Sequence, residues 1–238
     1  MAELSKVPEF RGFTLEIGGL RWMLCDRISV KERCQPASYA SDTLELHEVY
    51  SGFQIIDEPH QMDIQSTSVI IKVKKHDNPE DTQISEEIST EIEHIQLTED
   101  CKSAPELLGY SIQRQGTSHS VPGGYIAFNV MSRVPGVDLS NYPVMEKEEQ
   151  RRVQLALLEA LWEFHKYRLR HWGQRLPNIV WDAKNDEWLG APSLVIRPWL
   201  IRGSYIVDLE DVEYFPDRKP DNVSINPWEQ LSLVMGSG

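Results

Sequence analysis

The chain has 238 residues, of which 40% are hydrophobic and seven are Trp, so it is long enough to bury a substantial core. Its formal net charge of −13 at pH 7 argues against a general nucleic-acid or anionic-membrane surface, because both need basic patches. Cys25, Cys34 and Cys101 have no metal-ligand spacing and indicate no disulfide framework. Without a signal-peptide core or a long apolar run, the sequence predicts a soluble, intracellular protein, cytoplasmic or nuclear.

The first 66 residues predict short strands whose arrangement the sequence leaves open. The glycine pair at 18–19 separates two short apolar stretches and predicts a hairpin. The alternating segment Thr43–Tyr50 predicts a further strand. The stretch Tyr50–Phe53 that follows is typical of a hairpin turn, and the alternative is a short loop that covers a phosphate.

The clearest strand of the N-terminal half is Ser68–Lys74, which is β-branched and apolar up to Lys72. A polar loop follows, and isoleucines spaced by four, four and three residues then predict a helix over about 84–97. Glu91 lies on the apolar stripe of that helix, and a carboxylate there needs a partner if it is buried. Lys72 is the nearest candidate, and the alternative is that Glu91 lies at the rim and reaches solvent.

A second strand, Tyr125–Met131, ends in a segment broken by Pro135 and Gly136, which predicts a boundary between two halves. The longest helix is predicted from Glu146 to about Arg170, with an acidic start and a basic end that match the helix dipole. A last short helix is predicted around 227–234.

The segment His171–Val180 follows this helix and leads into an apolar, strand-like run, and a second predicted strand, Tyr205–Glu210, contains Asp208. A His, an Asn seven places later and a strand with Asp are together similar to the catalytic and metal-binding loops of the protein-kinase-like superfamily. Leu176-Pro-Asn-Ile-Val180 and the hinge-like Met131–Gly136 make the chain resemble small fungal and microbial kinase-like proteins of the aminoglycoside-phosphotransferase type.

The resemblance implies a site for Mg²⁺ and for phosphoryl transfer. His171 corresponds to the His of the catalytic loop, and Gly173 stands where the family has its catalytic Asp. Asn178 and Asp208 correspond to the two metal ligands, and both carry the hard oxygen donors that Mg²⁺ prefers. Gly173 cannot accept a proton, so the group that orients and deprotonates an acceptor hydroxyl is missing.

The resemblance also implies an ATP site. Lys72, held by Glu91, would contact the phosphates, and the hinge segment with Met131 and Arg133 would contact the adenine. Expected partners are a nucleotide and an unidentified small-molecule or protein acceptor, with no nucleic acid and no membrane.

Each motif residue also has an ordinary structural reading. Asn178 after a proline is typical of a turn, Asp208 of a residue that caps a strand end, and His171 of a buried residue at a helix end. Two functions therefore stay open. One is an ATP-binding, degenerate phosphotransferase, and the other is an inactive pseudokinase that acts as a binding or scaffolding module, with its groove filled by side chains such as Trp172.

The resemblance predicts an α+β, two-lobed kinase-like fold. An antiparallel-sheet N-lobe would span 1–130, a hinge 131–138, and a reduced, mostly helical C-lobe 139–238, with the catalytic-loop-like segment at 171–180.

Overall fold

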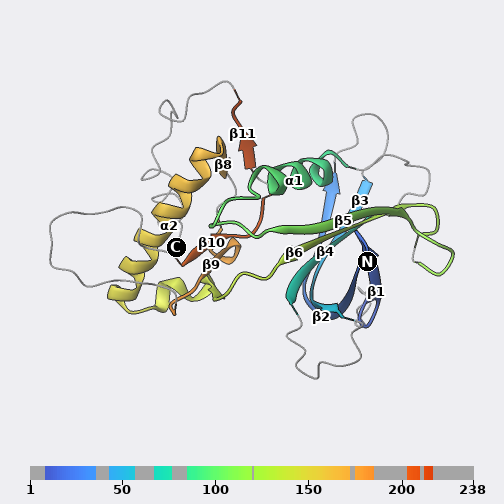
Figure 1. Ribbon diagram of the computed structural model, residues 1–238, viewed down its shortest axis with the longest axis horizontal. Coiled ribbons are helices and arrows are strands. Elements are labelled where there is room, and N and C mark those ends of the chain that lie inside the picture. Colours follow the sequence, from blue (N-terminus) through green and yellow to red (C-terminus); the bar gives the residue numbers. More distant parts are fainter. Residues whose placement is uncertain are drawn as a thin grey trace. The chain divides into compact units, whose positions relative to one another are not determined.

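The computed structural model (Figure 1) divides the chain into two compact units. The first comprises Met1–Ile92 and Leu107–Arg133, and the second comprises Glu93–Glu106 and Val134–Gly238. The division after Arg133 falls within the segment 131–138 that was predicted to be a hinge. The structure describes residues 9–35, 43–56, 67–76, 85–119, 121–171, 175–184, 203–209 and 212–216.

The first unit is built on a six-stranded antiparallel sheet with the order β1-β2-β3-β4-β6-β5. Its edge strands β1 and β5 approach each other, so the sheet is barrel-like and nearly closed. The strands span Thr14–Ile17 (β1), Leu20–Gln35 (β2), Thr43–Ile55 (β3), Ser68–His76 (β4), Leu107–Arg114 (β5) and Tyr125–Ser132 (β6).

Tight turns and bulges explain how this sheet curves. Gly18 and Gly19 connect β1 to β2 with φ angles of 61° and 76°, the backbone that suits a two-residue hairpin, so the predicted hairpin is confirmed. The pairing of β2 with β3 is irregular between Leu24 and Arg27 and again between Arg27 and Ser29. Such irregularities increase twist and bend the strands, which brings the two edges of the sheet together.

The inner face of the sheet holds the main apolar core of the first unit. Alternate residues of β4, Val69, Ile71 and Val73, point into it because side chains of a strand alternate between faces. They pack with buried residues of the other strands and of the segment before β1: Phe10, Leu15, Ile17, Trp22, Leu24, Tyr50, Ile126, Phe128 and Val130.

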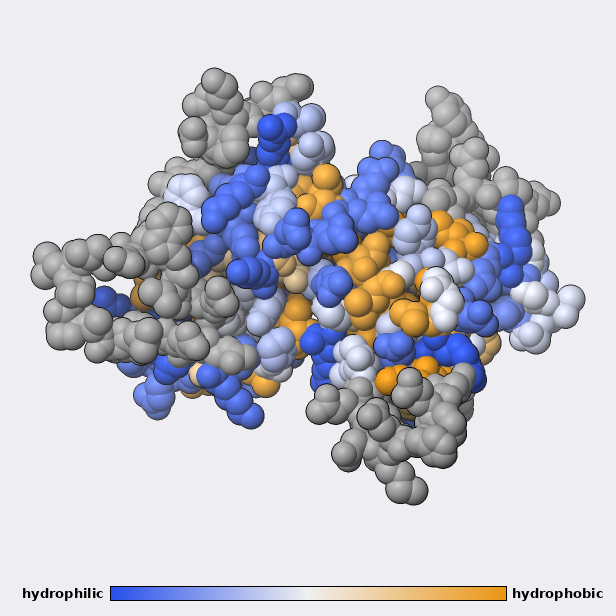
Figure 2. Space-filling model, viewed as in Figure 1, coloured by the Kyte–Doolittle hydropathy of each residue, from blue (hydrophilic) through white to orange (hydrophobic). Residues whose placement is uncertain are grey.

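Helix α1 (Glu86–Leu97) packs on the opposite face through its N-terminal part, where Ile88 and Ile92 form a buried cluster with Tyr125 and Ala127 of β6. The predicted helix over 84–97 is therefore confirmed over 86–97. Further along the sheet, Tyr110 and Ile112 of β5 are exposed large side chains. Figure 2 shows hydrophobic residues, in orange, exposed on the part of this face that carries the sheet of the first unit.

The second unit contains helix α2 (Lys147–Lys166) and several short elements. A three-stranded sheet has the order β10-β9-β7 and a two-stranded sheet pairs β11 with β8. The bounds are Val137–Asp138 (β7), Leu139–Val144 (the 3-10 helix η1), Leu169–His171 (β8), Leu176–Asn178 (η2), Ile179–Trp181 (β9), Ser204–Ile206 (β10) and Val212–Tyr214 (β11).

Helix α2 is shorter than predicted. The expected end near Arg170 is replaced by a C-cap at Tyr167, and Arg168 has a positive φ of 61°, a conformation that stops a helix. Leu169 and Arg170 then leave the helix and form β8 opposite Tyr214 and Glu213 of β11. Helical periodicity cannot reveal this end, because it depends on pairing with a strand more than forty residues later.

The predicted kinase-like architecture is wrong. The protein is mostly β, and α1 and α2 are the only two substantial helices among the described residues. After Val134 the described chain holds one α-helix and five short strands, which is not a helical C-lobe. In this half the periodicity of the sequence supported α2 and a short helix around 227–234, and the rest of the expected lobe came from the resemblance. The helix predicted around 227–234 lies outside the described residues.

Two further predicted elements differ in the structure. Tyr50–Phe53 forms no turn, because β3 runs through it without interruption. The strand predicted at Tyr205–Glu210 is the shorter β10. No helix among the described residues has the length and apolar character needed to cross a membrane.

Gly52 of β3 lies where β2, β3 and β4 approach one another closely. A Cβ atom at this position would lie 2.6 Å from the carbonyl oxygen of Met23 in β2 and 2.9 Å from Cδ1 of Ile71 in β4. Any side chain would therefore push β3 away from one neighbour. At Gly116, by contrast, the nearest atom would be 3.6 Å away, in the side chain of His119.

We expect Gly52→Ala to lower the free energy of unfolding by about 1–3 kcal/mol, because the added methyl group overpacks the sheet. Gly116→Ala is the matched control and should change stability by no more than about 1 kcal/mol. Urea unfolding followed by tryptophan fluorescence measures both variants. Equal midpoints for the two variants would contradict the close approach at Gly52.

Candidate functional site

The ion pair predicted between Lys72 and Glu91 is present in the first unit. Lys72 lies on the face of β4 opposite Val69, Ile71 and Val73, because alternate residues of a strand point to opposite sides. Its Nζ contacts Oε1 of Glu91, which α1 carries to the same face. The side chain of Glu91 is 0% exposed and that of Lys72 is 11% exposed, so the alternative that Glu91 reaches solvent is excluded.

Two further side chains, which sequence reasoning missed, hold the same carboxylate. Nζ of Lys74 lies 2.9 Å from Oε2 of Glu91, and Nδ2 of Asn129 donates to Oε2 at 3.4 Å. The period of β4 places Lys74 on the face of Lys72, and strand register places Asn129 opposite Lys72. Asn129 in an otherwise apolar strand was a usable signal, because a buried amide needs a polar partner.

The hinge residues proposed for adenine have different environments. Met131 is buried near the end of β6, opposite Ile70 of β4. Arg133 is exposed, and its backbone N–H donates to the carbonyl of Ser68 at 3.4 Å. Backbone pairing of this kind continues the sheet, and the proposed role of these two residues in adenine binding stays a prediction.

Asn178 and Asp208, the predicted metal ligands, meet in the second unit. Strands β9 and β10 are antiparallel, with Ile206 opposite Ile179, so the residue before β9 and the residues after β10 come together. Nδ2 of Asn178 donates to Oδ2 of Asp208 at 2.9 Å, and the Val207 N–H donates to the Asn178 carbonyl at 3.0 Å. The pair carries one carboxylate and one amide oxygen, hard donors of the kind that can hold Mg²⁺ together with phosphates and water.

His171 and Gly173, the two residues assigned to the catalytic loop, are not brought together with Asn178 and Asp208 by any described contact. His171 is the last residue of β8 and pairs with Val212 of β11, so it lies on a strand and not in a loop. Gly173 and Trp172 lie outside the described residues. That Gly173 offers no proton acceptor follows from the sequence alone.

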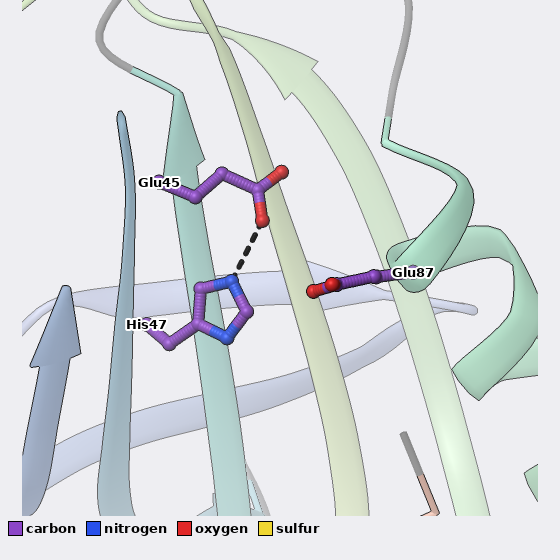
Figure 3. A group of neighbouring side chains, drawn as sticks. All are labelled: Glu45, His47 and Glu87. Carbon is purple, nitrogen blue, oxygen red and sulfur yellow. Dashed lines mark hydrogen bonds and ion pairs between the residues drawn. The ribbon is translucent and has the colours of Figure 1, made fainter. Parts of the chain in front are cut away.

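A second polar group lies on the α1 side of the sheet and was not predicted from the sequence. Figure 3 shows Glu45 and His47 of β3 and Glu87 of α1 pointing toward one another. One ligand atom from each lies within 4.8 Å of the others, and Nε2 of His47 lies 2.7 Å from Oε2 of Glu45. The alternation of β3 predicts that Glu45 and His47 share one face of the strand. It does not predict which face α1 covers.

The protonation of Glu45 is set by its neighbours. Burial raises the pKa of this carboxyl, but hydrogen bonds from His47, Tyr125 and Ser85 outweigh burial and hold the pKa below its ordinary value. Tyr125 donates its hydroxyl to Oε1 of Glu45, and burial together with this hydrogen bond raises the pKa of the tyrosine. Glu45 is therefore an ionised carboxylate inside the protein, with a neutral tyrosine as donor.

Comparison of the sequence with models of known protein families and with curated proteins gave no match. The kinase-like resemblance therefore rests on the motif residues alone, and their geometry is the evidence for function.

We expect Glu91→Gln to lower the free energy of unfolding by about 3–5 kcal/mol, because removing one partner leaves buried lysine charge uncompensated. Glu93→Gln, in the same helix but exposed, is the control and should stay within about 0.5 kcal/mol of the parent chain. Equilibrium urea unfolding at neutral pH compares them. Similar losses in both variants would mean that Glu91 is not the buried centre of the network.

Proposed function

We propose that this protein binds ATP together with Mg²⁺ and that Gly173 deprives it of ordinary phosphotransferase turnover. The observation that carries the proposal is the contact of Lys72 with the fully buried Glu91. A lysine held in place by a buried carboxylate presents a fixed cation, and fixed cations beside phosphates are the main requirement of an ATP site.

The pair in the second unit supports the Mg²⁺ part of the proposal. Asn178 and Asp208 are hydrogen-bonded to each other, so their oxygen atoms are already ordered before a metal arrives. Asp208 is partly exposed, which allows access for a hydrated ion. These two residues would hold the ion, and a bound Mg²⁺ supplies positive charge of the kind that neutralises phosphate. The Lys72–Glu91 pair and the Asn178–Asp208 pair are tested below by separate variants.

The alternative is a binding or scaffolding module with no nucleotide. The contact of Lys74 with Glu91 favours it, because two lysines and an amide around one carboxylate form a network that stabilises the fold without a ligand. Nucleotide binding and this alternative differ in whether ATP raises the thermal stability of the chain. ATP is an intracellular ligand, so the proposal also places the protein inside the cell, as the cysteine pattern predicts.

ATP with Mg²⁺ should raise the melting temperature of the full chain. At about 100 times Kd, a ligand adds about 2.7 kcal/mol to the free energy of unfolding. Each kcal/mol corresponds to roughly 2–4 °C for a chain of this size. Differential scanning fluorimetry with ATP–Mg²⁺, ATP–EDTA and Mg²⁺ alone measures the shift. No shift at millimolar ATP–Mg²⁺ would overturn the proposal and favour the scaffolding module.

Two variants, each with a matched control, assign the residues. Lys72→Met should lose most of the ATP-induced shift, whereas Lys74→Met, which removes the more deeply buried cation beside Glu91, should keep it.

Asp208→Asn keeps the size of the side chain but removes a charge, and it should abolish the Mg²⁺ dependence of the shift. Asp138→Asn is its control. Each shift is taken relative to the variant's own melting temperature, so loss of stability is not mistaken for loss of binding. A Mg²⁺ dependence that persists in Asp208→Asn would contradict the metal assignment.

Turnover is a separate prediction. If only the base is missing, Gly173→Asp should raise the rate of ATP hydrolysis above that of the parent chain, because a carboxylate can orient and deprotonate water. The double variant with Asp208→Asn should lose that gain. A steady-state phosphate-release assay measures both, and an unchanged rate in Gly173→Asp would show that more than the base is lost.

A further inference from the structure

Glu45, His47 and Glu87 form a polar group that has no part in the proposed ATP site. Glu45 and His47 are buried two positions apart on β3, and Glu87 approaches from the first turn of α1 (Figure 3). One ligand atom from each lies within 4.8 Å of the others. We propose that these three side chains bind a divalent transition-metal ion such as Zn²⁺.

The donor types fit this class of ion. An imidazole nitrogen and two carboxylate oxygens suit Zn²⁺ and its neighbours, whereas Ca²⁺ and Mg²⁺ prefer oxygen donors alone. Three protein ligands with a fourth position for water is the arrangement of a catalytic or exchangeable zinc site, not of a closed structural one. Nε2 of His47 and Oε2 of Glu45 are 2.7 Å apart and share a hydrogen bond, so an ion that binds both atoms replaces the shared proton.

The surroundings supply the supporting contacts that metal ligands need. Tyr125 donates to Oε1 of Glu45, the carboxylate oxygen that does not contact His47, and so holds the carboxylate with Oε2 directed toward the histidine. Outer hydrogen bonds of this kind orient ligands and strengthen binding. The side chain of Glu87 is 39% exposed, so the group has a route to solvent by which an ion can enter.

Nearby cations are the main opposing interaction. Nη1 of Arg33 lies 3.5 Å from Oε2 of Glu87, a long contact at a partly exposed position, where ion pairs stabilise little. Lys74 of β4 is paired across the sheet with His47 of β3. Nζ of Lys74 lies 2.9 Å from Oε2 of Glu91, and this carboxylate offsets the charge of the lysine. A metal ion must therefore displace Arg33 from Glu87 and break the hydrogen bond between His47 and Glu45.

The test measures Zn²⁺ binding to the full chain by equilibrium dialysis, with no nucleotide present. The parent chain should bind one Zn²⁺. His47→Gln and Glu87→Gln should each weaken binding at least 10-fold, because each removes a ligand. Glu86→Gln is the matched control, since it removes the same charge from the preceding, exposed residue of α1 and should leave affinity unchanged. Arg33→Gln should bind Zn²⁺ at least as tightly as the parent, because it removes the competing cation.

Co²⁺ provides a spectroscopic check on the ligands. Visible bands of a nitrogen- and oxygen-ligated Co²⁺ that disappear in Glu87→Gln but persist in Glu86→Gln would support the site. Three results would overturn the proposal. They are no Zn²⁺ retained by the folded parent chain, equal affinity of Glu87→Gln and Glu86→Gln, or an intense thiolate-to-cobalt band that places the ion on cysteine.

Discussion

A fully buried carboxylate, Glu91, governs the chemistry of the sheet face beneath α1. Removing a carboxylate from water costs several kcal/mol unless cations and hydrogen-bond donors replace the water. Lys72, Lys74 and Asn129 supply that replacement. The two lysines share a face because β4 alternates, and Asn129 reaches the same carboxylate because β6 places it opposite Lys72. The position of α1 is therefore tied to the register of two strands.

The same registers explain why a second polar group lies on this face. Pairing of β3 with β4 places His47 opposite Lys74, so Glu45 and His47 point toward α1 while Tyr50 points into the apolar core. A shift of one residue in β3 would exchange the two sets, burying Glu45 and His47 among apolar side chains. Glu48 on the other side of β3 has its own cations, Arg27 and Lys75, so both faces of this strand carry charges whose partners depend on its register.

Local signals predicted part of this arrangement, and non-local pairing decided the rest. The β-branched run around Lys72, the isoleucine spacing before Leu97 and the glycine pair at 18–19 each act within a few residues, and the structure confirms the elements they predicted. The Lys72–Glu91 pair was also predictable, because a carboxylate on an apolar stripe demands a cation.

The end of α2 was not predictable from the local sequence, because it depends on β8 pairing with β11. The group around Glu45 was missed for a related reason: strand alternation alone does not say which face a helix will cover. The helical C-lobe was wrong because it came from a resemblance in a few motif residues and not from periodicity.

Helix α1 connects the two polar groups through its own geometry. Glu87 and Glu91 are four residues apart, so they lie on one side of the helix about 6 Å apart along its axis. One carboxylate turns toward His47 and Glu45, and the other toward the two lysines. The first group is the one proposed to bind a cation and the second the one proposed to contact phosphate, and they lie on neighbouring strands of one sheet. Because the backbone of α1 holds the two carboxylates at a fixed spacing, a shift of the helix that moves one moves the other.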